Sequence, residues 1–309
     1  MTTRILITGS SGLVGSALAP KLEALGWEVV RFDIEAPRVG DRHDVRDEKA
    51  VFDAVESCDG IVHMAAVSRV KWGQDEPDLC VATNVGGTRN VVEAAKSAEA
   101  TPWILFTSSR EVYGEAEDLP VAENASLRPM NIYARSKVTG EELMATARSE
   151  GLSTAVVRLS NVYGSTDDYA DRVVPAFARA AVLEERLRVD GADHTFDFTH
   201  IDDTVRGLLR IIDRLEQGRR ELAPMHLLTG QPTTLGELAE LAVHIAGTDA
   251  PIIEAPPRSY DVCHFFGDPR KTEQLLDWSA RIPIEEGLHR LISDFRNENL
   301  MSTEVLESS

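Results

Sequence analysis

The chain is poor in cysteine and has no long apolar segment. Its three cysteines, Cys58, Cys80 and Cys263, are far apart in the sequence and odd in number, so we expect neither a disulfide framework nor a metal site. No apolar run reaches the ~18 residues that a membrane-spanning helix requires. A strand begins by Arg4, which leaves no room for a targeting segment. We therefore expect a cytoplasmic protein with no membrane partner.

Positive charge is also scarce. The 309 residues include 51 Asp and Glu against 32 Lys and Arg, which gives a formal net charge of −19. Nucleic-acid phosphates are bound mainly through Lys and Arg, so we expect no nucleic-acid partner. Most of the basic residues are arginines. A salty cytoplasm and a GC-rich genome both favour that balance, and the sequence does not separate them.

What the sequence does contain is a glycine-rich turn near its start. Gly9, Gly12 and Gly15 lie between an apolar strand at residues 4–8 and an apolar helical pattern at 17–25. In dinucleotide sites such glycines permit a tight turn, close approach of the pyrophosphate and close packing of helix on strand. The free N–H groups of the helix start favour phosphate. The cofactor contacts predicted here are Gly9, Ser11, Gly12, Leu13 and Val14.

Asp33 ends the next predicted strand, about twenty residues after this turn. A carboxylate at that place can accept hydrogen bonds from both ribose hydroxyls of NAD and would repel the 2′-phosphate of NADP. Arg38 is close enough in the sequence to weaken that preference. The sequence therefore predicts NAD as the cofactor, with Asp33 as a ligand of its ribose.

Apolar strands and helices alternate through the first half of the chain. Strands are expected at residues 28–32, 60–66, 102–107 and 154–159, and helices at 84–100 and 136–150. This spacing predicts an α/β fold with a doubly wound parallel sheet of the Rossmann type. After residue 165, prolines interrupt shorter elements. We predict an NAD-binding domain at 1–165, joined by about 194–230, and a smaller substrate-binding lobe at 166–193 and 231–309.

Tyr133 and Lys137 are four residues apart and would share one face of a helix. An unperturbed tyrosine has a pKa of roughly 10 and is not a base near neutral pH. A nearby cation favours the phenolate and lowers that pKa, so the pair is a candidate general acid/base unit. The same spacing also arises by chance with a solvated lysine. The dinucleotide signature at the start of the chain favours the catalytic interpretation.

Further motifs occur in the order of a known family. They are Asp44-Val45, His63-Met64-Ala65-Ala66, Asn84-Val-x-Gly-Thr88, Ser109-x-x-Val-Tyr-Gly114, Arg158-x-x-Asn161 and Asp197-Phe-x-His. To about residue 295 the chain resembles an extended short-chain dehydrogenase/reductase of the NAD-dependent epimerase/dehydratase family, which acts on nucleotide sugars. The resemblance implies further NAD contacts at Asp44, Val45, Met64, Ala65, Ala66, Thr107, Tyr133 and Lys137.

The resemblance also implies a reaction. NAD would be reduced and reoxidised within one turnover, as in a nucleotide-sugar 4-epimerase that works through a transient 4-keto sugar. Tyr133 would take the proton from a sugar hydroxyl, and Ser109 would bond the same oxygen. Lys137 would bind the nicotinamide ribose and lower the pKa of Tyr133.

Two positions leave the reaction and the substrate open. Glu111 matches a catalytic acid of dehydratases and decarboxylases in this family, whereas Arg110 replaces the dehydratase aspartate. A nucleotide-sugar 4,6-dehydratase or decarboxylase is therefore one alternative. Phe196 stands where the family has an arginine that binds the diphosphate. A dehydrogenase acting on a sugar or sugar acid without a nucleotide is therefore the other.

The substrate contacts that we expect combine these positions with other family positions: Ser68, Ser109, Arg110, Asn161, Phe196 and Arg258. Arg258 corresponds to a second diphosphate arginine of the family. Arg69 and Lys71 follow Ser68 and are two extra cations that could meet a carboxylate or a phosphate.

We also expect a homodimer, because in relatives the helices corresponding to 84–100 and 136–150 pair with their copies. Small or apolar residues on their outer faces would suit close packing. The candidates are Val91, Ala94, Ala95, Leu143, Met144 and Ala147. The alternative is that these side chains face the sheet.

Overall fold

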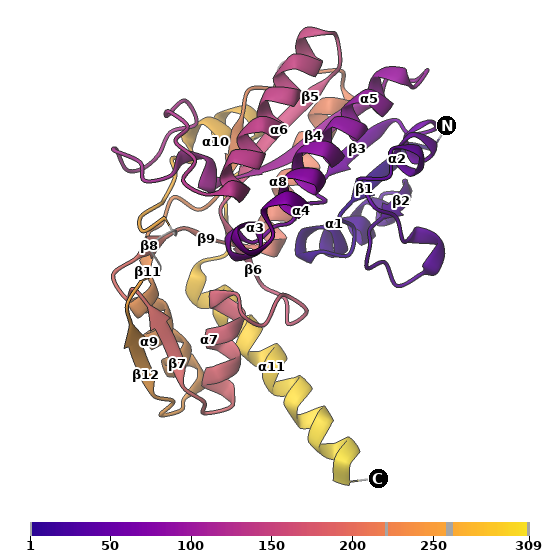
Figure 1. The fold of residues 1–309 in the computed structure, drawn as a ribbon. Helices are drawn as coiled ribbons and strands as arrows, with labels where there is room; N and C mark the ends of the chain where they lie inside the picture. The colour runs from indigo at the N-terminus through magenta and orange to yellow at the C-terminus, as the bar shows by residue number, and fades with distance from the viewer. Residues whose placement is uncertain (1, 220–221, 258–261, 308–309) are drawn as a thin grey trace.

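The structure is a computed structural model that describes residues 2–219, 222–257 and 262–307. Its centre is a parallel sheet of six strands in the order β10-β5-β4-β3-β1-β2 (Figure 1). The predicted doubly wound fold is confirmed. The strands are β1 (Arg4–Thr8), β2 (Glu28–Phe32), β3 (Gly60–His63), β4 (Trp103–Ser109), β5 (Thr154–Leu159) and β10 (Met225–Leu227).

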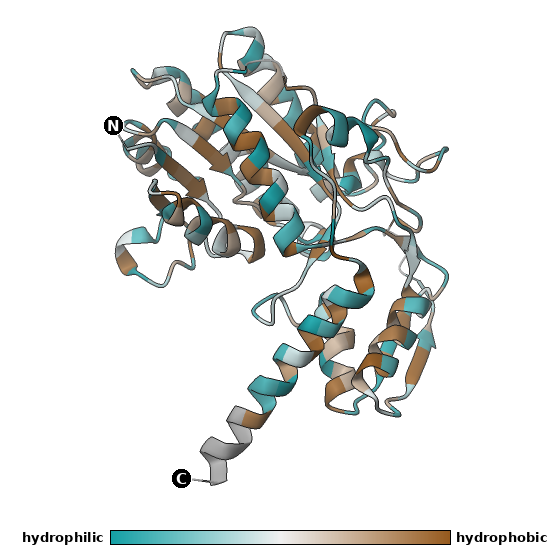
Figure 2. Ribbon diagram, turned by 180° about the vertical axis from the view of Figure 1, so that it is seen from behind, coloured by the Kyte–Doolittle hydropathy of each residue, from teal (hydrophilic) through white to brown (hydrophobic). Residues whose placement is uncertain are grey.

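Helices cover both faces of this sheet because neighbouring residues of a strand point to opposite sides. Ile5 and Ile7 pack on the side of α1 (Leu13–Ala24) and α8 (Ile201–Glu216). Leu6 packs on the side of α2 (Glu48–Val55), α5 (Gly87–Ser97) and α6 (Ile132–Ser149). All three side chains are fully buried, and Figure 2 shows the apolar character of the central strands.

The apolar residues that we expected on the outer faces of α5 and α6 lie inside the chain. Val91, Ala94, Ala95, Met144 and Ala147 are buried in the core beneath the sheet, and Leu143 is half-buried. That argument for a homodimer is therefore wrong. The residues recur at helical spacing, and the face they form is the one that covers the sheet.

Short elements connect the strands on the α5 side of the sheet. They are the 3₁₀ helix η1 (Val39–Asp41), α3 (Val70–Asp75), α4 (Pro77–Val81), a π-helical segment (Ala82–Gly86) that leads into α5, and the 3₁₀ helix η3 (Arg110–Tyr113). The last of these follows β4 directly, so it begins at the carboxyl edge of the sheet.

The smaller lobe lies beyond that edge (Figure 1). Its elements are α7 (Val173–Val182), β7 (Leu187–Asp190), β8 (Thr195–Phe196), β11 (Thr233–Thr234), α9 (Leu235–Ala246), β12 (Ile252–Ala255) and α11 (Ile284–Glu307). The strands β6 (Asn161–Tyr163) and β9 (Phe198–His200) pair at the junction. Leu276, which ends α10 (Arg270–Leu276), and Trp278 pack in the core of the larger domain.

The topology also locates a ligand site. From β1 the chain continues to β2 on one side, and β3 lies on the other side of β1. Ligands of such sheets bind at the carboxyl ends of the strands on either side of this switch point. Among the described residues, no helix is long and apolar enough to cross a membrane.

Candidate active site

The glycine turn fits the close contacts around it. Gly9 has φ +73°, and a Cβ atom there would lie 2.7 Å from the amide nitrogen of Ala65. A Cβ atom on Gly15 would lie 2.3 Å from the carbonyl oxygen of Gly9. Both positions therefore require glycine, the first for its conformation and both for space.

The start of α1 is open to an anion. Gly12 is its N-cap and offers no side chain to accept from the helix N–H groups, and no acidic side chain lies in the first turn. Leu13 and Val14, which open the helix, are only half-buried. Unused N–H groups and the positive end of the helix dipole bind phosphate groups. The turn therefore fits a pyrophosphate.

Asp33 lies beside this turn at the carboxyl end of β2. Its carboxylate accepts hydrogen bonds from the backbone N–H of Ser11 (2.9 Å) and of Glu35 (2.8 Å). These bonds hold the carboxylate beside the turn, where the ribose of a bound dinucleotide would lie. They also connect the turn to β2.

We predict that the protein binds NAD more tightly than NADP, because the Asp33 carboxylate would face the 2′-phosphate of NADP. Asp33→Ser should reduce that preference by at least tenfold. Calorimetric titration of both cofactors measures the ratio, and Asp41→Ser, on the nearby helix η1, is the control. Equal affinities of the unaltered protein for NAD and NADP would contradict the role of Asp33.

The end of β3 is held by a buried chain of hydrogen bonds. The Thr8 hydroxyl lies 2.7 Å from Nδ1 of His63 and accepts from the N–H groups of Met64 and Ala65. Nε2 of His63 lies 2.9 Å from the hydroxyl of Thr88. Burial lowers the pKa of His63 to about 3, so this ring is neutral. The network places Met64 and Ala65 next to Gly9. The contact of Met64, Ala65 and Ala66 with a cofactor stays a prediction.

Asn84 is a site residue that the prediction missed. Its amide oxygen accepts from the N–H of Val67 (2.7 Å), and its amide nitrogen donates to the Val67 carbonyl and to the hydroxyl of Ser136 (2.8 Å). Ser136 in turn donates to the carbonyl of Tyr133. Asn84 thus connects the segment that includes Ser68 with the helix of Tyr133. The Asn84-Val-x-Gly-Thr88 motif was the signal for it.

Asp44 and Val45 lie farther along the same edge. The Asp44 carboxylate pairs with the guanidinium of Arg46 at 2.5 Å, which holds the pKa of Asp44 below its usual value. Val45 is buried, and its carbonyl accepts from the side chain of Asn90 (2.9 Å). The contact of these two residues with a cofactor remains a prediction.

Ser109, Tyr133 and Lys137 meet at the carboxyl end of β4. Ser109 is the last residue of β4; its hydroxyl accepts from the backbone N–H of Glu111 (3.2 Å) and lies close enough to the Tyr133 phenol to affect the pKa of Tyr133. The ammonium of Lys137 donates to the carbonyl oxygen of Thr107 (2.9 Å) and lies 5.9 Å from the centre of the Tyr133 ring. Tyr133 and Lys137 are both buried.

Burial decides the charges of this group. It raises the pKa of Tyr133 to about 12, although the nearby Ser109 hydroxyl opposes the rise. It lowers the pKa of Lys137 to about 8. For the protein alone, the expected lowering of the Tyr133 pKa is therefore wrong, because removal of the phenol from water outweighs the nearby cation.

Glu111 and Arg110 form an ion pair next to this group. One carboxylate oxygen of Glu111 lies 2.9 Å from Nη2 of Arg110, and the other accepts from the side-chain amide of Asn131 (3.1 Å). Asn131 is also the N-cap of α6, where it accepts from the N–H of Ala134. Asn131 was not predicted, although an asparagine at the start of a helix is a common capping signal.

The other predicted substrate residues are distributed around this edge. Phe196 is buried in β8, and its ring centre lies 4.5 Å from the guanidinium carbon of Arg110. Asn161 begins β6 and is half-buried. Arg258 lies outside the described residues.

The two extra cations after Ser68 already have partners. Arg69 donates twice to the carboxylate of Asp171, at 2.6 and 2.9 Å, and Lys71 lies 3.5 Å from the carboxylate of Asp75. Neither is therefore placed as an unsatisfied cation for a carboxylate or a phosphate.

Residues 165–172, here called the strap, lie within electrostatic range of both Tyr133 and the end of β2. The charge of Arg172 influences Tyr133. Burial raises the pKa of Tyr169, and the carboxylates of Glu35 and Asp33 add to that rise. The strap is therefore near the Tyr133 region at Arg172 and near Asp33 at Tyr169.

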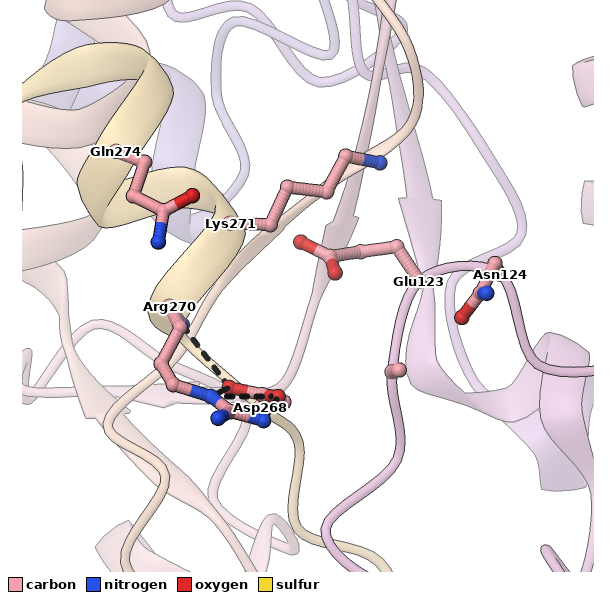
Figure 3. Close-up of a pocket in the computed structure, with 7 residues that line it drawn as sticks. Glu123, Asn124, Asp268, Arg270, Lys271 and Gln274 are labelled. Atoms are coloured by element: carbon pink, nitrogen blue, oxygen red, sulfur yellow. Dashed lines mark hydrogen bonds and ion pairs between the residues drawn. The ribbon is translucent and has the colours of Figure 1, made fainter.

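A separate hollow lies between α10 and residues 122–124 (Figure 3). Its charged groups have partners within the chain: Arg270 pairs with Asp268 at 2.5 Å, and Lys271 donates to the Pro224 carbonyl. Of the predicted site residues that the structure describes, none lines this hollow. The glycine turn and the β4 edge therefore remain the candidate active site.

Comparison with known proteins places this geometry in a family. The sequence profile of the NAD dependent epimerase/dehydratase family matches residues 5–223. The chain is 28% identical to a putative UDP-glucose 4-epimerase of Methanocaldococcus jannaschii, covering 96% of this chain and 99% of that protein. It is 31% identical to UDP-glucuronic acid decarboxylase 1 of Arabidopsis thaliana, covering 97% and 72%.

A solved structure agrees with these relatives. The crystallised protein MoeE5 in complex with UDP-glucuronic acid and NAD superposes with a TM-score of 0.88, at 26% identity, covering 96% of this chain and 99% of that one. The profile match extends over more than half of the chain, and it includes the glycine turn and the Ser109–Tyr133–Lys137 group. The chain therefore belongs to the NAD-dependent epimerase/dehydratase family.

Proposed function

We propose that the protein is an NAD-dependent nucleotide-sugar 4-epimerase that works through a transient 4-keto sugar. The observation that carries the proposal is the group of Ser109, Tyr133 and Lys137 at the carboxyl end of β4, in the same domain as the glycine turn. The similarity to a putative UDP-glucose 4-epimerase over nearly the full length of both proteins supports it.

The residues would divide the work as follows. NAD, when bound, would supply reversible hydride transfer. The turn of Gly9 and Gly12 would hold the pyrophosphate, and Asp33 the ribose. Tyr133 would remove the proton from the sugar hydroxyl and give it back, while Ser109 stabilises the charge that develops on that oxygen. The Lys137 ammonium would bind the nicotinamide ribose and keep positive charge close to Tyr133.

The state of the tyrosine adds a requirement to this mechanism. A pKa of about 12 leaves Tyr133 protonated near neutral pH. In the protein alone it is therefore a poor base, and additional positive charge near the phenol must lower its pKa for proton removal. Tyr133 is therefore a competent base only when this additional positive charge is present in the site.

A decarboxylase is the second candidate, because the Arabidopsis relative is 31% identical. The contacts of Glu111 support the epimerase over a lyase that uses Glu111 as base, since each oxygen of that carboxylate already has a partner, Arg110 or Asn131. We propose that Glu111 positions Arg110 and Asn131. Glu111→Gln should then retain a measurable fraction of epimerase turnover.

The test is a panel of nucleotide sugars incubated with the purified protein. Products are separated by chromatography, and absorbance at the NADH band is followed at the same time. A product of unchanged mass without NADH accumulation supports the epimerase. Release of carbon dioxide or a 4-keto product would show that the protein is a lyase and not an epimerase. Stoichiometric NADH would show that it is a dehydrogenase of a sugar or sugar acid.

An epimerase must retain its cofactor through the turnover, and we predict that the strap contributes to this. Arg69→Gln should increase the dissociation rate of NAD about three- to tenfold, because a bidentate charge-assisted pair holds the strap to α3. Lys71→Gln, which removes the adjacent exposed pair with Asp75, is the matched control.

Dissociation rates are measured by displacement of NAD into excess competitor. The charge-exchanged double variant Arg69→Asp, Asp171→Arg should restore slow release. Unchanged release from Arg69→Gln would mean that the strap does not retain the cofactor.

We further propose a cytoplasmic homodimer. Cys58 and Cys80 are buried thiols, as expected in a reducing compartment. The outward sides of α5 and α6 carry both signs of charge, with Arg89 and Glu93 on one helix and Arg135 and Glu142 on the other, which suits a two-fold pairing of these helices. Light scattering should give twice the chain mass of 33.9 kDa. A value near 34 kDa at micromolar concentration would exclude the dimer there.

A further inference from the structure

Arg110 connects the catalytic edge of the sheet with the smaller lobe. It follows Ser109 directly and begins the 3₁₀ helix η3. Its side chain is only 12% exposed. The guanidinium carbon lies 4.5 Å from the ring centre of Phe196 and 5.8 Å from that of Phe265. Arg110 is therefore a half-buried cation that lies over the Phe196 ring at the junction.

This guanidinium has a donor without a partner among the described residues. Nη2 pairs with Glu111, but Nη1 is buried and has no hydrogen-bond partner in the part of the chain that the structure describes. A buried donor without an acceptor is unfavourable, and more so when it is charged. The second oxygen of Glu111 accepts from Asn131. Nη1 is therefore available to an acceptor from a ligand or from water.

The stacking also determines how such a ligand would approach. A guanidinium donates its hydrogen bonds in its own plane, and an aromatic ring against one face leaves the edges of that plane open. Phe196 and Phe265 offer no side-chain acceptor that could compete. The geometry thus favours an oxygen arriving at the edge of the guanidinium.

Two other arginines of this region also pair with carboxylates. Arg69 pairs with Asp171, and Arg172 lies 3.3 Å from the carboxylate of Asp168. The chain as a whole carries a net charge of −19, so an anionic substrate gains its attraction from locally placed cations rather than from the overall field. Arg110 is such a cation.

We propose that Arg110 binds an anionic oxygen of the nucleotide-sugar substrate and contributes to the choice of that substrate. Two parts of such a substrate carry this chemistry: the diphosphate, and a carboxylate on the sugar when the sugar is a uronic acid. The inference rests on the proposed function, because it requires a nucleotide sugar in the site.

The test compares Arg110→Gln with the NAD-loaded unaltered protein. Dissociation constants are measured by calorimetry for UDP, UDP-glucose and UDP-glucuronic acid, with kcat and KM for whichever sugars react. Arg179→Gln, an exposed arginine of α7, is the matched control, and NAD content and melting temperature verify that the variants are folded.

If Arg110 binds the diphosphate, all three ligands should bind at least tenfold more weakly, and KM should change more than kcat. If it binds a sugar carboxylate, only UDP-glucuronic acid should lose at least tenfold. Affinities within twofold of the unaltered protein for all three ligands would overturn the proposal and leave Arg110 as an internal ion-pair partner of Glu111.

If Arg110→Gln does not fold, Arg110→Lys tests the proposal in its place. It keeps the charge but loses the planar fork of donors, so the affected ligands should bind at least threefold more weakly, and unchanged binding would overturn the proposal. The failure of the proposed function is a different result: the unaltered protein would then bind no nucleotide sugar, whatever residue stands at position 110.

Discussion

Replacing Tyr133 with phenylalanine is expected to abolish turnover while leaving NAD bound. The ring of Tyr133 is buried, and Ser109 lies close enough to influence the pKa of its hydroxyl. Phenylalanine fills the same volume without the oxygen that moves the proton. A positioned acid or base contributes about 10²–10⁴ to a rate, so kcat should fall at least 100-fold. Steady-state kinetics and calorimetric titration with NAD measure the two effects.

Tyr163→Phe is the matched control for this variant. The Tyr163 hydroxyl is also buried, but it has no hydrogen-bond partner and lies in the core of the smaller lobe. Its removal should leave turnover unchanged and the melting temperature equal or higher, since an unsatisfied polar group is lost. If Tyr133→Phe keeps more than about one hundredth of the activity, Tyr133 is not the acid/base group.

The second large effect is expected at Lys137. Lys137→Met should reduce turnover at least 100-fold and at the same time stabilise the cofactor-free protein. Burial lowers the pKa of Lys137 from 10.5 to about 8, and a shift of this size corresponds to a cost of roughly 3 kcal/mol for keeping the ammonium charged. The lost bond to the Thr107 carbonyl offsets part of the gain. We expect a net increase of about 1–2 kcal/mol in the free energy of unfolding at pH 7.

The pH dependence of the stability difference between the two proteins tests whether the charge on Lys137 causes it. The pKa of Lys137 is lower in the folded protein than in the unfolded chain, so between about pH 8 and 10.5 the unfolded chain binds more protons. The stability of the unaltered protein therefore gains from this group as the pH rises through that range. The advantage of Lys137→Met should shrink from pH 7 to pH 10.

Urea unfolding of both proteins at the two pH values measures this difference. A variant that is less stable than the unaltered protein at pH 7 would contradict a costly buried charge. An advantage that grows toward pH 10 would contradict the assigned direction of the pKa shift. In either case the change in stability would need an explanation other than the burial of a charged lysine.

Much of the fold followed from short-range patterns. The glycine turn at 9–15 fixes a backbone conformation within a few residues, and alternating apolar strands and helices specify a doubly wound sheet. These features could be predicted because each depends on residues adjacent in the chain. The boundaries were less accurate: α6 begins at Ile132 rather than near residue 136, since its cap depends on Asn131.

The face that a helix buries was not determined in this way. Val91, Ala94 and Ala95 form one side of α5 at helical spacing, which fits equally a partner helix and the sheet beneath it. The structure places that side on the sheet. Periodicity reveals an apolar face but not the surface that covers it, because that surface comes from other parts of the chain.

By itself, the sequence determined the family, and it predicted the cofactor turn and the group of Ser109, Tyr133 and Lys137, because their residues recur in fixed local motifs. Only the tertiary structure decided the charge states of Tyr133 and Lys137, since burial is produced by side chains distant in the sequence. It also decided the surroundings of Arg110, where Phe196 and Phe265 arrive from separate segments. The cost of burying a charge and the lack of a partner for a hydrogen-bond donor both depend on all the side chains packed around the group. No local sequence pattern contains that information.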